Sequence, residues 1–197
     1  MRKDYEIILK LIPENSKVLD IGCSDGELIS YLENKGVSAQ GVELNQEKVI
    51  KCLEKGLDVI HGDINLIVED FPFNQFDYCL LTQTIQAVQK PDQLLNTLKK
   101  VSKNIIVSFN NSARLSKISN FLLSGSFDSL LKKADSDHWY NTDYIHPCSI
   151  KDFKKLAENL DLKIISTFDV ISQRKFENGK IPSNLFCKEV LFHITDE

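Results

Sequence analysis

Apolar residues recur along the chain in two patterns: short β-branched runs, and longer stretches with apolar positions three or four residues apart. The short runs predict strands at 16–21, 37–44, 57–61, 76–81 and 105–109. The longer stretches predict amphipathic helices at 4–12, 25–34, 46–55 and from Pro91 onward. Strands that alternate with helices at this spacing indicate a doubly wound parallel sheet.

The pattern changes after the fifth predicted strand. Residues 110–147 begin with a helix that Gly125 ends, and a polar stretch rich in aromatic residues follows. The apolar face of that helix is formed by Leu115, Ile118 and Leu122. Because long decorated segments usually carry function, we expect this insertion to cover a ligand cleft as a lid.

Two further strands are predicted at 162–171 and 185–194, after a helix that Ser149 begins with Asp152 three positions later. The polar loop between the strands suits a long antiparallel hairpin at the sheet edge, and no linker rich in Pro, Gly and Ser interrupts the chain. We therefore expect one α/β domain over residues 1–197. Its sheet would be Rossmann-like and doubly wound, with about seven strands, the last antiparallel.

Composition restricts the function classes. The chain is 42% hydrophobic and 26% charged with a net charge of −4, which argues against a general nucleic-acid binder. No apolar run reaches the roughly 18 residues of a membrane helix, so no membrane partner is expected. Five cysteines without a CxxC pair or an export signal predict reduced thiols and a cytoplasmic location. No Cys or His pair has ligand spacing, so no metal site is expected.

The stretch from Val18 to Glu27 carries the first candidate chemistry. An apolar run ends in Asp20, a turn with Gly22 and Gly26 follows, and a helix then begins. In an open α/β sheet, ligands bind outside the carboxyl ends of strands, and glycine lets them approach the backbone. The spacing is Gly-x-x-x-Gly, because Ser24 stands where a middle glycine is often found.

Three acidic residues stand at or just beyond successive strand ends: Asp20, Glu43 and Asp63. Glu43 follows the first of them at close to the roughly 20-residue spacing at which an acidic residue meets a ribose. A carboxylate at this position can accept hydrogen bonds from both ribose hydroxyls. The alternative interpretation is that Glu43 is simply a solvated strand end. Because all three acids occupy equivalent positions at successive strand ends, the pattern favours a nucleoside site.

This pattern resembles that of class I S-adenosylmethionine-dependent methyltransferases, over about residues 16–195. The chain resembles more closely the methionine biosynthesis protein MetW family. That second resemblance is carried by residues 76–88, 107–109, 139–142 and 145–146.

The resemblance implies a cofactor, S-adenosylmethionine or S-adenosylhomocysteine, and roles for individual residues. Glu43 would bind the ribose, and Leu44 would pack on the adenine. Asp63 and the amide of Ile64 would meet the adenine edge. Gly22 would lie against the methionine part.

The resemblance also predicts that Asp20 and the rest of the turn contribute to cofactor binding, the turn through Cys23, Ser24 and Gly26. Ser24 departs from the family by adding a Cβ where the cofactor approaches most tightly. Cys23 is also explained as a buried inert thiol.

The family is linked to methionine biosynthesis, and its members work with a homoserine O-acyltransferase as partner. Two functions follow from the resemblance. The chain is a methyltransferase acting on a small-molecule acceptor, or a non-catalytic cofactor-binding partner that regulates the acyltransferase.

Residues beyond the fourth predicted strand are candidates for the reacting end of the site. Gln83 is expected to bind the cofactor, and Gln86 is a loop amide or a contact to the acceptor. His146 and Tyr140 are candidate catalytic residues, since imidazole titrates near neutral pH. His146 is equally explained as a structural hydrogen-bonding group, and Tyr140 with Trp139 as anchors of the lid.

Two other nucleotide sites fit the turn poorly. A nicotinamide site requires Gly-x-Gly-x-x-Gly, whose second glycine is Ser24 here. A P-loop requires Lys and Ser or Thr after the last glycine, where this chain has Glu27-Leu28.

The chain also departs from the MetW family in two places. A proline and aromatic residues are missing at 110–112, and a proline is missing before Trp139.

Overall fold

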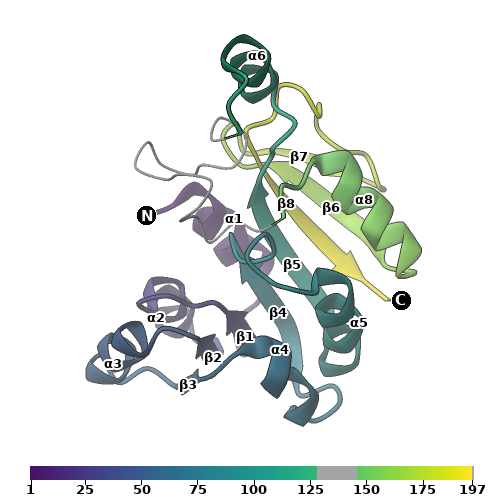
Figure 1. The fold of residues 1–197 in the computed structure, drawn as a ribbon. Helices are drawn as coiled ribbons and strands as arrows, with labels where there is room; N and C mark the ends of the chain where they lie inside the picture. The colour runs from purple at the N-terminus through teal and green to yellow at the C-terminus, as the bar shows by residue number, and fades with distance from the viewer. Residues whose placement is uncertain (128–145, 197) are drawn as a thin grey trace.

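A computed structural model describes residues 1–127 and 146–196 of the chain. A twisted sheet forms its middle layer, and helices cover both faces (Figure 1). The strands are β1 (Lys17–Ile21), β2 (Ser38–Glu43), β3 (Val59–His61), β4 (Phe76–Thr82), β5 (Ser102–Asn110), β6 (Lys163–Asp169), β7 (Arg174–Glu177) and β8 (Glu189–Thr195). The helices are α1 (Lys3–Leu11), α2 (Glu27–Asn34), α3 (Gln46–Glu54), α4 (Ile64–Ile67), the 3-10 turn η1 (Val68–Asp70), α5 (Pro91–Val101), α6 (Leu115–Ser124) and α8 (Ile150–Asn159).

The sheet has the strand order β3-β2-β1-β4-β5-β8-β6-β7. The first five strands pair in parallel, and β8 runs antiparallel to both of its neighbours, as predicted for the last strand. The doubly wound α/β fold is therefore confirmed. Because β1 to β4 are parallel, their carboxyl ends meet at one edge of the sheet.

Two expectations about the C-terminal strands need correction. The predicted hairpin pairing between β6 and β8 exists, but β8 lies inside the sheet between β5 and β6. Its apolar residues face both sides, as in Leu191 and Phe192, so both of its surfaces and both of its edges are covered there. The sheet edge is instead β7, a short strand paired with β6, which makes eight strands where about seven were expected.

The helix of the predicted lid is present as α6, and Gly125 ends it with a left-handed backbone (φ +65°). None of its side chains is buried. The rest of the lid, including Trp139 and Tyr140, lies outside the described residues. No helix in the described part of the chain is long and apolar enough to cross a bilayer.

Side-chain alternation along the strands divides the core into two clusters. On one face of β1, Leu19 and Ile21 pack in the cluster covered by α5 and α8. On the other face, Val18 packs in the cluster covered by α1, α2 and α3, which includes Ile8 of α1. Asp20 has the parity of Val18 and therefore lies on the sheet face that α1, α2 and α3 cover.

Three phenylalanines form the centre of the cluster beneath α8. Phe153 of α8 packs against Phe109 of β5 and Phe192 of β8, with ring centroids 5.3 and 4.7 Å away. All three are essentially inaccessible to solvent. The cluster joins the helix to the two strands that extend the sheet past β4.

We predict that Phe153→Ala lowers the free energy of unfolding by about 3–5 kcal/mol, because it leaves a cavity among buried rings. Urea denaturation followed by circular dichroism measures the change. Phe186→Ala is the matched control, since Phe186 is 74% exposed. Equal, small effects for the two variants would contradict the assignment of this cluster as core.

Candidate functional site

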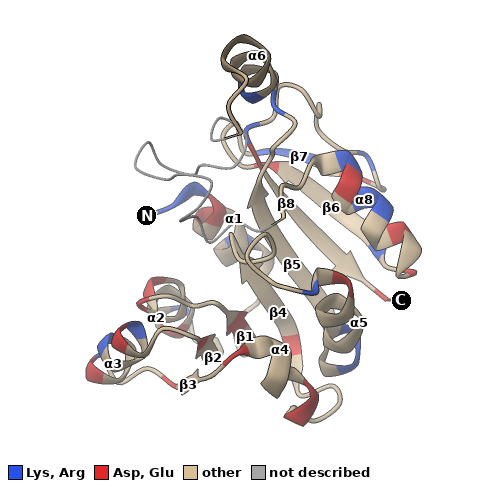
Figure 2. Ribbon diagram, viewed as in Figure 1, with Lys and Arg blue, Asp and Glu red and all other residues tan. Residues whose placement is uncertain are grey.

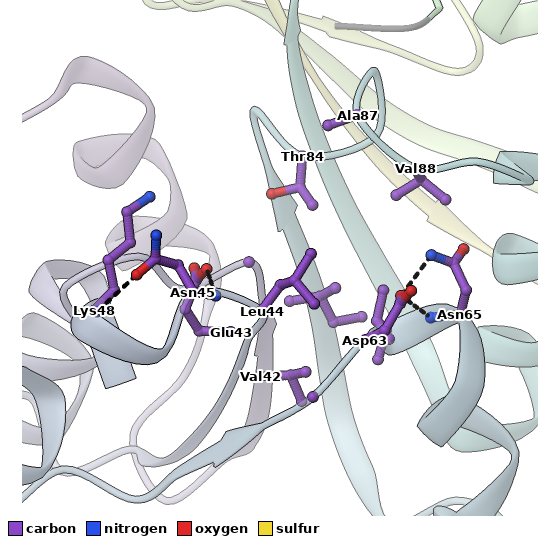
Figure 3. A pocket seen from close by; sticks show the side chains of 14 residues that line it. Val42, Glu43, Leu44, Asn45, Lys48, Asp63, Asn65, Thr84, Ala87 and Val88 are labelled. Carbon is purple, nitrogen blue, oxygen red and sulfur yellow. Dashed lines mark hydrogen bonds between the residues drawn. The ribbon is translucent and has the colours of Figure 1, made fainter. Parts of the chain in front are cut away.

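A cavity of about 560 Å³ opens at the carboxyl ends of β1 to β4 (Figure 3). It brings together five of the predicted cofactor residues, which come from three separate strand ends. These five are Gly22, Glu43, Leu44, Asp63 and Ile64. The acidic positions at the ends of β1 and β2 and at the start of α4 gather at this edge (red in Figure 2).

Glu43 joins the two turns that border the cavity. Its Oε2 accepts a hydrogen bond from the backbone N–H of Ser24, and its Oε1 accepts one from Asn45, each at 2.8 Å. Glu43 is only 7% exposed, and these two bonds satisfy and orient its nearly buried carboxylate. Each carboxylate oxygen has a second lone pair, which is the acceptor capacity that a ribose diol requires.

Asp63 begins the short helix α4 on the opposite side of the cavity. Its Oδ1 accepts hydrogen bonds from the backbone N–H and the side-chain amide of Asn65, at 2.9 and 2.7 Å. Both bonds fall on Oδ1, so Oδ2 retains its acceptor capacity. The buried Ile64 adds an apolar wall beside this carboxylate.

Apolar side chains form the other walls of the cavity. Leu44 is 66% exposed, and Figure 3 shows it extending into the space between Glu43 and Thr84. Ala87 and Val88, from the segment after β4, line the cavity as well. An apolar slot with polar groups at both ends suits a planar heteroaromatic ring attached to a diol.

Gly22 stands where the first turn approaches the segment after β4. Its backbone has φ +74°, and a Cβ added there would lie 2.6 Å from Oγ1 of Thr84. A side chain at this position would therefore collide with Thr84. The glycine lets the two segments meet at one end of the cavity, its inner end.

Ser24 adopts a left-handed backbone (φ +55°), as the glycine it replaces would do. Its N–H donates to Glu43, and its carbonyl accepts from the thiol of Cys52 at 3.3 Å. These bonds offset the roughly 1–2 kcal/mol that a left-handed residue other than glycine costs. The contact of Ser24 with the site is thus through its backbone.

Two other residues of the turn, Gly26 and Cys23, pack against the body of the protein and do not line the cavity. A Cβ on Gly26 would lie 2.3 Å from Leu57, so this glycine allows α2 to begin close to the chain before β3. Cys23 is 4% exposed and packs against Gly41 of β2. Burial raises the pKa of its thiol, which favours the interpretation as an inert packing residue.

Asp20 is 1% exposed, and no described residue donates a hydrogen bond to its Oδ1. Burial raises its pKa to about 7, and the charge of Arg2 opposes this shift. The neighbouring carboxylates of Asp4 and Glu43 raise it further. An unpartnered buried acceptor is costly, so this carboxylate is poised to receive a cationic donor.

Gln83 directly precedes Thr84 but does not itself line the cavity; it lies at the end of β4, beside the end of β5 and the start of β8. Its side-chain amide donates to Glu189 and accepts from Asn110, each at 2.8 Å. Burial raises the pKa of Glu189. The network links three strand ends on the side of the sheet that α1 covers.

His146 braces the segment after β4. Its backbone N–H donates to the carbonyl of Gln86, and its Nε2 lies 3.1 Å from the carbonyl of Gln89. A carbonyl only accepts, so the Nε2 of His146 donates this hydrogen bond, and Nδ1 makes no hydrogen bond to the described residues. Gln86 is 2% exposed and donates back to the carbonyl of His146 at 3.4 Å.

Several residues of the cavity were missed by the sequence analysis. Thr84, Ala87 and Val88 have side chains common in any loop, and they fall in the segment 76–88 that resembles the MetW family, but neither signal assigned them to the site. Asn45 and Lys48 also line the cavity. Asn45 carried a stronger signal, because it is the N-cap of α3 and accepts from the backbone N–H of Lys48.

Comparison with solved structures supports the fold. An S-adenosylmethionine-dependent methyltransferase from Methanosarcina mazei superimposes with a TM-score of 0.70 at 16% identity, over 96% of each chain. A TehB-like S-adenosylmethionine-dependent methyltransferase from Corynebacterium glutamicum gives 0.66 at 14% identity, over 100% of this chain and 89% of that one. At such identities the similarity establishes the Rossmann-like methyltransferase fold.

Sequence comparison places the chain in a family. The bifunctional methionine biosynthesis protein MetXA/MetW of Rhodopirellula baltica is 31% identical in an alignment of 202 positions that covers 96% of this chain. The chain spans only 32% of that relative's length. Residues 2–194 match the family described as methionine biosynthesis protein MetW, and the chain belongs to this family.

Proposed function

We propose that this chain binds S-adenosylmethionine or S-adenosylhomocysteine in the cavity and acts in methionine biosynthesis as a methyltransferase on a small-molecule acceptor. The observation that carries the proposal is the pairing of Glu43 and Asp63 across an apolar slot. Glu43 would bind the ribose hydroxyls, and Leu44 would pack on the adenine. Asp63 and the amide of Ile64 would meet the adenine edge.

The inner end of the cavity fits the rest of the cofactor. Gly22 lines this end of the cavity, and its lack of a side chain lets the thioether or sulfonium chain pass close to the backbone. Beyond it, the unpartnered Oδ1 of Asp20 supplies an acceptor for the α-ammonium group. These carboxylate acceptors are therefore complementary to the ribose, the adenine edge and the ammonium group of an adenosyl amino acid.

When bound, S-adenosylmethionine supplies a methyl group that already carries its leaving group, so the protein need not activate it. The contribution of this chain is to position the acceptor and to exclude water. His146 and Tyr140 remain the candidates for taking a proton from the acceptor. His146 would act through Nδ1, because Nε2 is held by the carbonyl of Gln89.

The fused relative supports a partner as well. Its name joins MetXA to MetW in one chain, and the MetW-like part occupies about a third of its length. We therefore include a homoserine O-acyltransferase as partner in the proposal. A purely regulatory, non-catalytic role in such a complex is the second candidate function.

Glu43→Gln is expected to weaken S-adenosylhomocysteine binding roughly 10- to 100-fold, because it removes a charge-assisted acceptor from the ribose. Isothermal titration calorimetry measures the change, and a thermal melt verifies folding. Glu47→Gln is the control, since Glu47 is exposed in the first turn of α3. Equal affinity of the Glu43 variant and the unmodified protein would refute the site.

Cofactor affinity is expected to rise with pH from 5.5 to about 7 and then to level off. The ligand's ammonium requires ionised Asp20, whose pKa burial raises to about 7 in the free protein. Below that pKa a proton must leave on binding, which weakens affinity by up to tenfold per pH unit. The facing charges are Arg2, Asp4 and Glu43.

Calorimetry in buffers of different ionisation enthalpy counts the protons released on binding. Asp20→Asn should abolish the slope and leave a weaker, flat profile. A profile of the unmodified protein that is flat over this range would contradict the role given to Asp20.

Two measurements separate catalysis from regulation. Turnover of labelled S-adenosylmethionine against a metabolite extract is expected if the chain is a methyltransferase. Co-purification with a homoserine O-acyltransferase, with acyltransferase activity raised in the complex, is expected if it is a partner. Cofactor binding with neither result would refute both functions and leave the binding site intact.

A further inference from the structure

The start of α1 brings a charged cluster to the carboxyl edge of the sheet. Figure 1 shows this end of α1 near the carboxyl end of β5, and a hydrogen bond links them. Ser108 of β5 donates its hydroxyl to Oδ2 of Asp4 at 3.1 Å. Asp4 is 1% exposed, so α1 begins with a buried carboxylate attached to a central strand.

Asp4 in turn orients Arg2. The guanidinium of Arg2 contacts the carboxylate of Asp4 bidentately, through Nε at 3.1 Å and Nη2 at 2.6 Å. Its Nη1 donates to the hydroxyl of Tyr5 at 3.1 Å. A guanidinium has five N–H donors, so two of them make no hydrogen bond to the described residues.

The position of Arg2 is significant because of the acids around it. Asp20 and Glu189 have the strand parity that faces α1, and the charge of Arg2 stabilises the ionised form of both. Among the described residues, this corner therefore combines the guanidinium of Arg2 with the carboxylates of Asp4, Asp20 and Glu189. The Arg2 side chain is 40% exposed, so its remaining donors are accessible to a ligand.

The corner adjoins the inner end of the proposed adenosine cavity. Gly22 lines that end and follows Asp20 by two residues. An adenosyl ligand that continues past Gly22 therefore brings its amino-acid end to the carboxylate of Asp20 and the guanidinium near it. A zwitterion needs an anion for its ammonium and a cation for its carboxylate, and the corner offers both.

We infer that Arg2 binds the α-carboxylate of the cofactor's amino-acid end, and that Asp4, fixed by Ser108, positions Arg2 for this contact. The inference rests on the proposed function, since it assumes an adenosyl amino acid in the cavity. It makes the first turn of α1 part of the binding site. It also makes the corner selective for ligands that carry an amino-acid end.

Three ligands separate the contributions to binding. S-adenosylhomocysteine carries the ammonium and the carboxylate, its decarboxylated analogue carries the ammonium alone, and 5′-methylthioadenosine carries neither. Calorimetry with the full chain, tagged at the C-terminus, gives the affinity for each. The unmodified protein should prefer S-adenosylhomocysteine over the decarboxylated analogue by roughly 10- to 100-fold.

Arg2→Met should remove that preference and leave 5′-methylthioadenosine binding unchanged. This variant leaves the buried carboxylate of Asp4 without its cation, which lowers stability. The double variant Arg2→Met with Asp4→Asn replaces both partners and so avoids leaving an unpaired buried charge. Lys3→Met is the matched control, because Lys3 is the exposed neighbour whose ammonium contacts the carbonyl of Ile171. A thermal melt accompanies each variant.

The outcomes are distinct. A folded double variant that keeps the preference for the carboxylate, or that weakens all three ligands equally, would overturn the role of Arg2. Failure of the unmodified protein to bind any of the three would instead refute the proposed function. Loss of the preference in the Arg2 variants, with Lys3→Met unchanged, supports the inference.

Discussion

The carboxylate of Glu43 is the interaction on which the proposed site depends. Its two oxygens accept the backbone N–H groups of Ser24 and Asn45, so a single side chain joins the turn after β1 to the start of α3. Both turns border the cavity. The N–H groups of Ser24 and Asn45 lie beyond the last paired residues of β1 and β2, so the side chain of Glu43 takes the place of a strand partner. A nearly buried acid is tolerated here because each oxygen has a charge-assisted partner.

Strand alternation distributes the remaining chemistry. Residues of one parity on β1, β5 and β8 face α1, and at the carboxyl edge these are polar or acidic: Asp20, Ser108, Asn110 and Glu189. Residues of the other parity belong to the apolar cluster beneath α5 and α8. The same strands therefore supply a core on one side and a charged corner on the other. α1 covers that corner and contributes Asp4 and Arg2 to it.

Two of the predicted site residues owe their place to packing. Gly26 allows α2 to begin against Leu57, and Cys23 fills the space beside Gly41. A motif of this kind combines groups that would touch a ligand with groups that shape the turn. His146 resembles the second kind in its described contacts, since it holds the segment of Gln86 and Gln89 that ends in the cavity wall.

The sequence by itself determined the doubly wound parallel sheet and the acids at the ends of β1 and β2 and after β3, because strand periodicity and strand ends are local properties of the chain. Local patterns do not report pairing partners, so only the tertiary structure decided that β8 lies between β5 and β6. The same limit applies to Thr84, Ala87 and Val88, whose residue types are unremarkable until the sheet brings them opposite Leu44. It applies most to Arg2, which is an ordinary basic residue in sequence. The fold brings its charge within electrostatic reach of Asp20, 18 positions away, because α1 packs on the face where β1 presents that carboxylate.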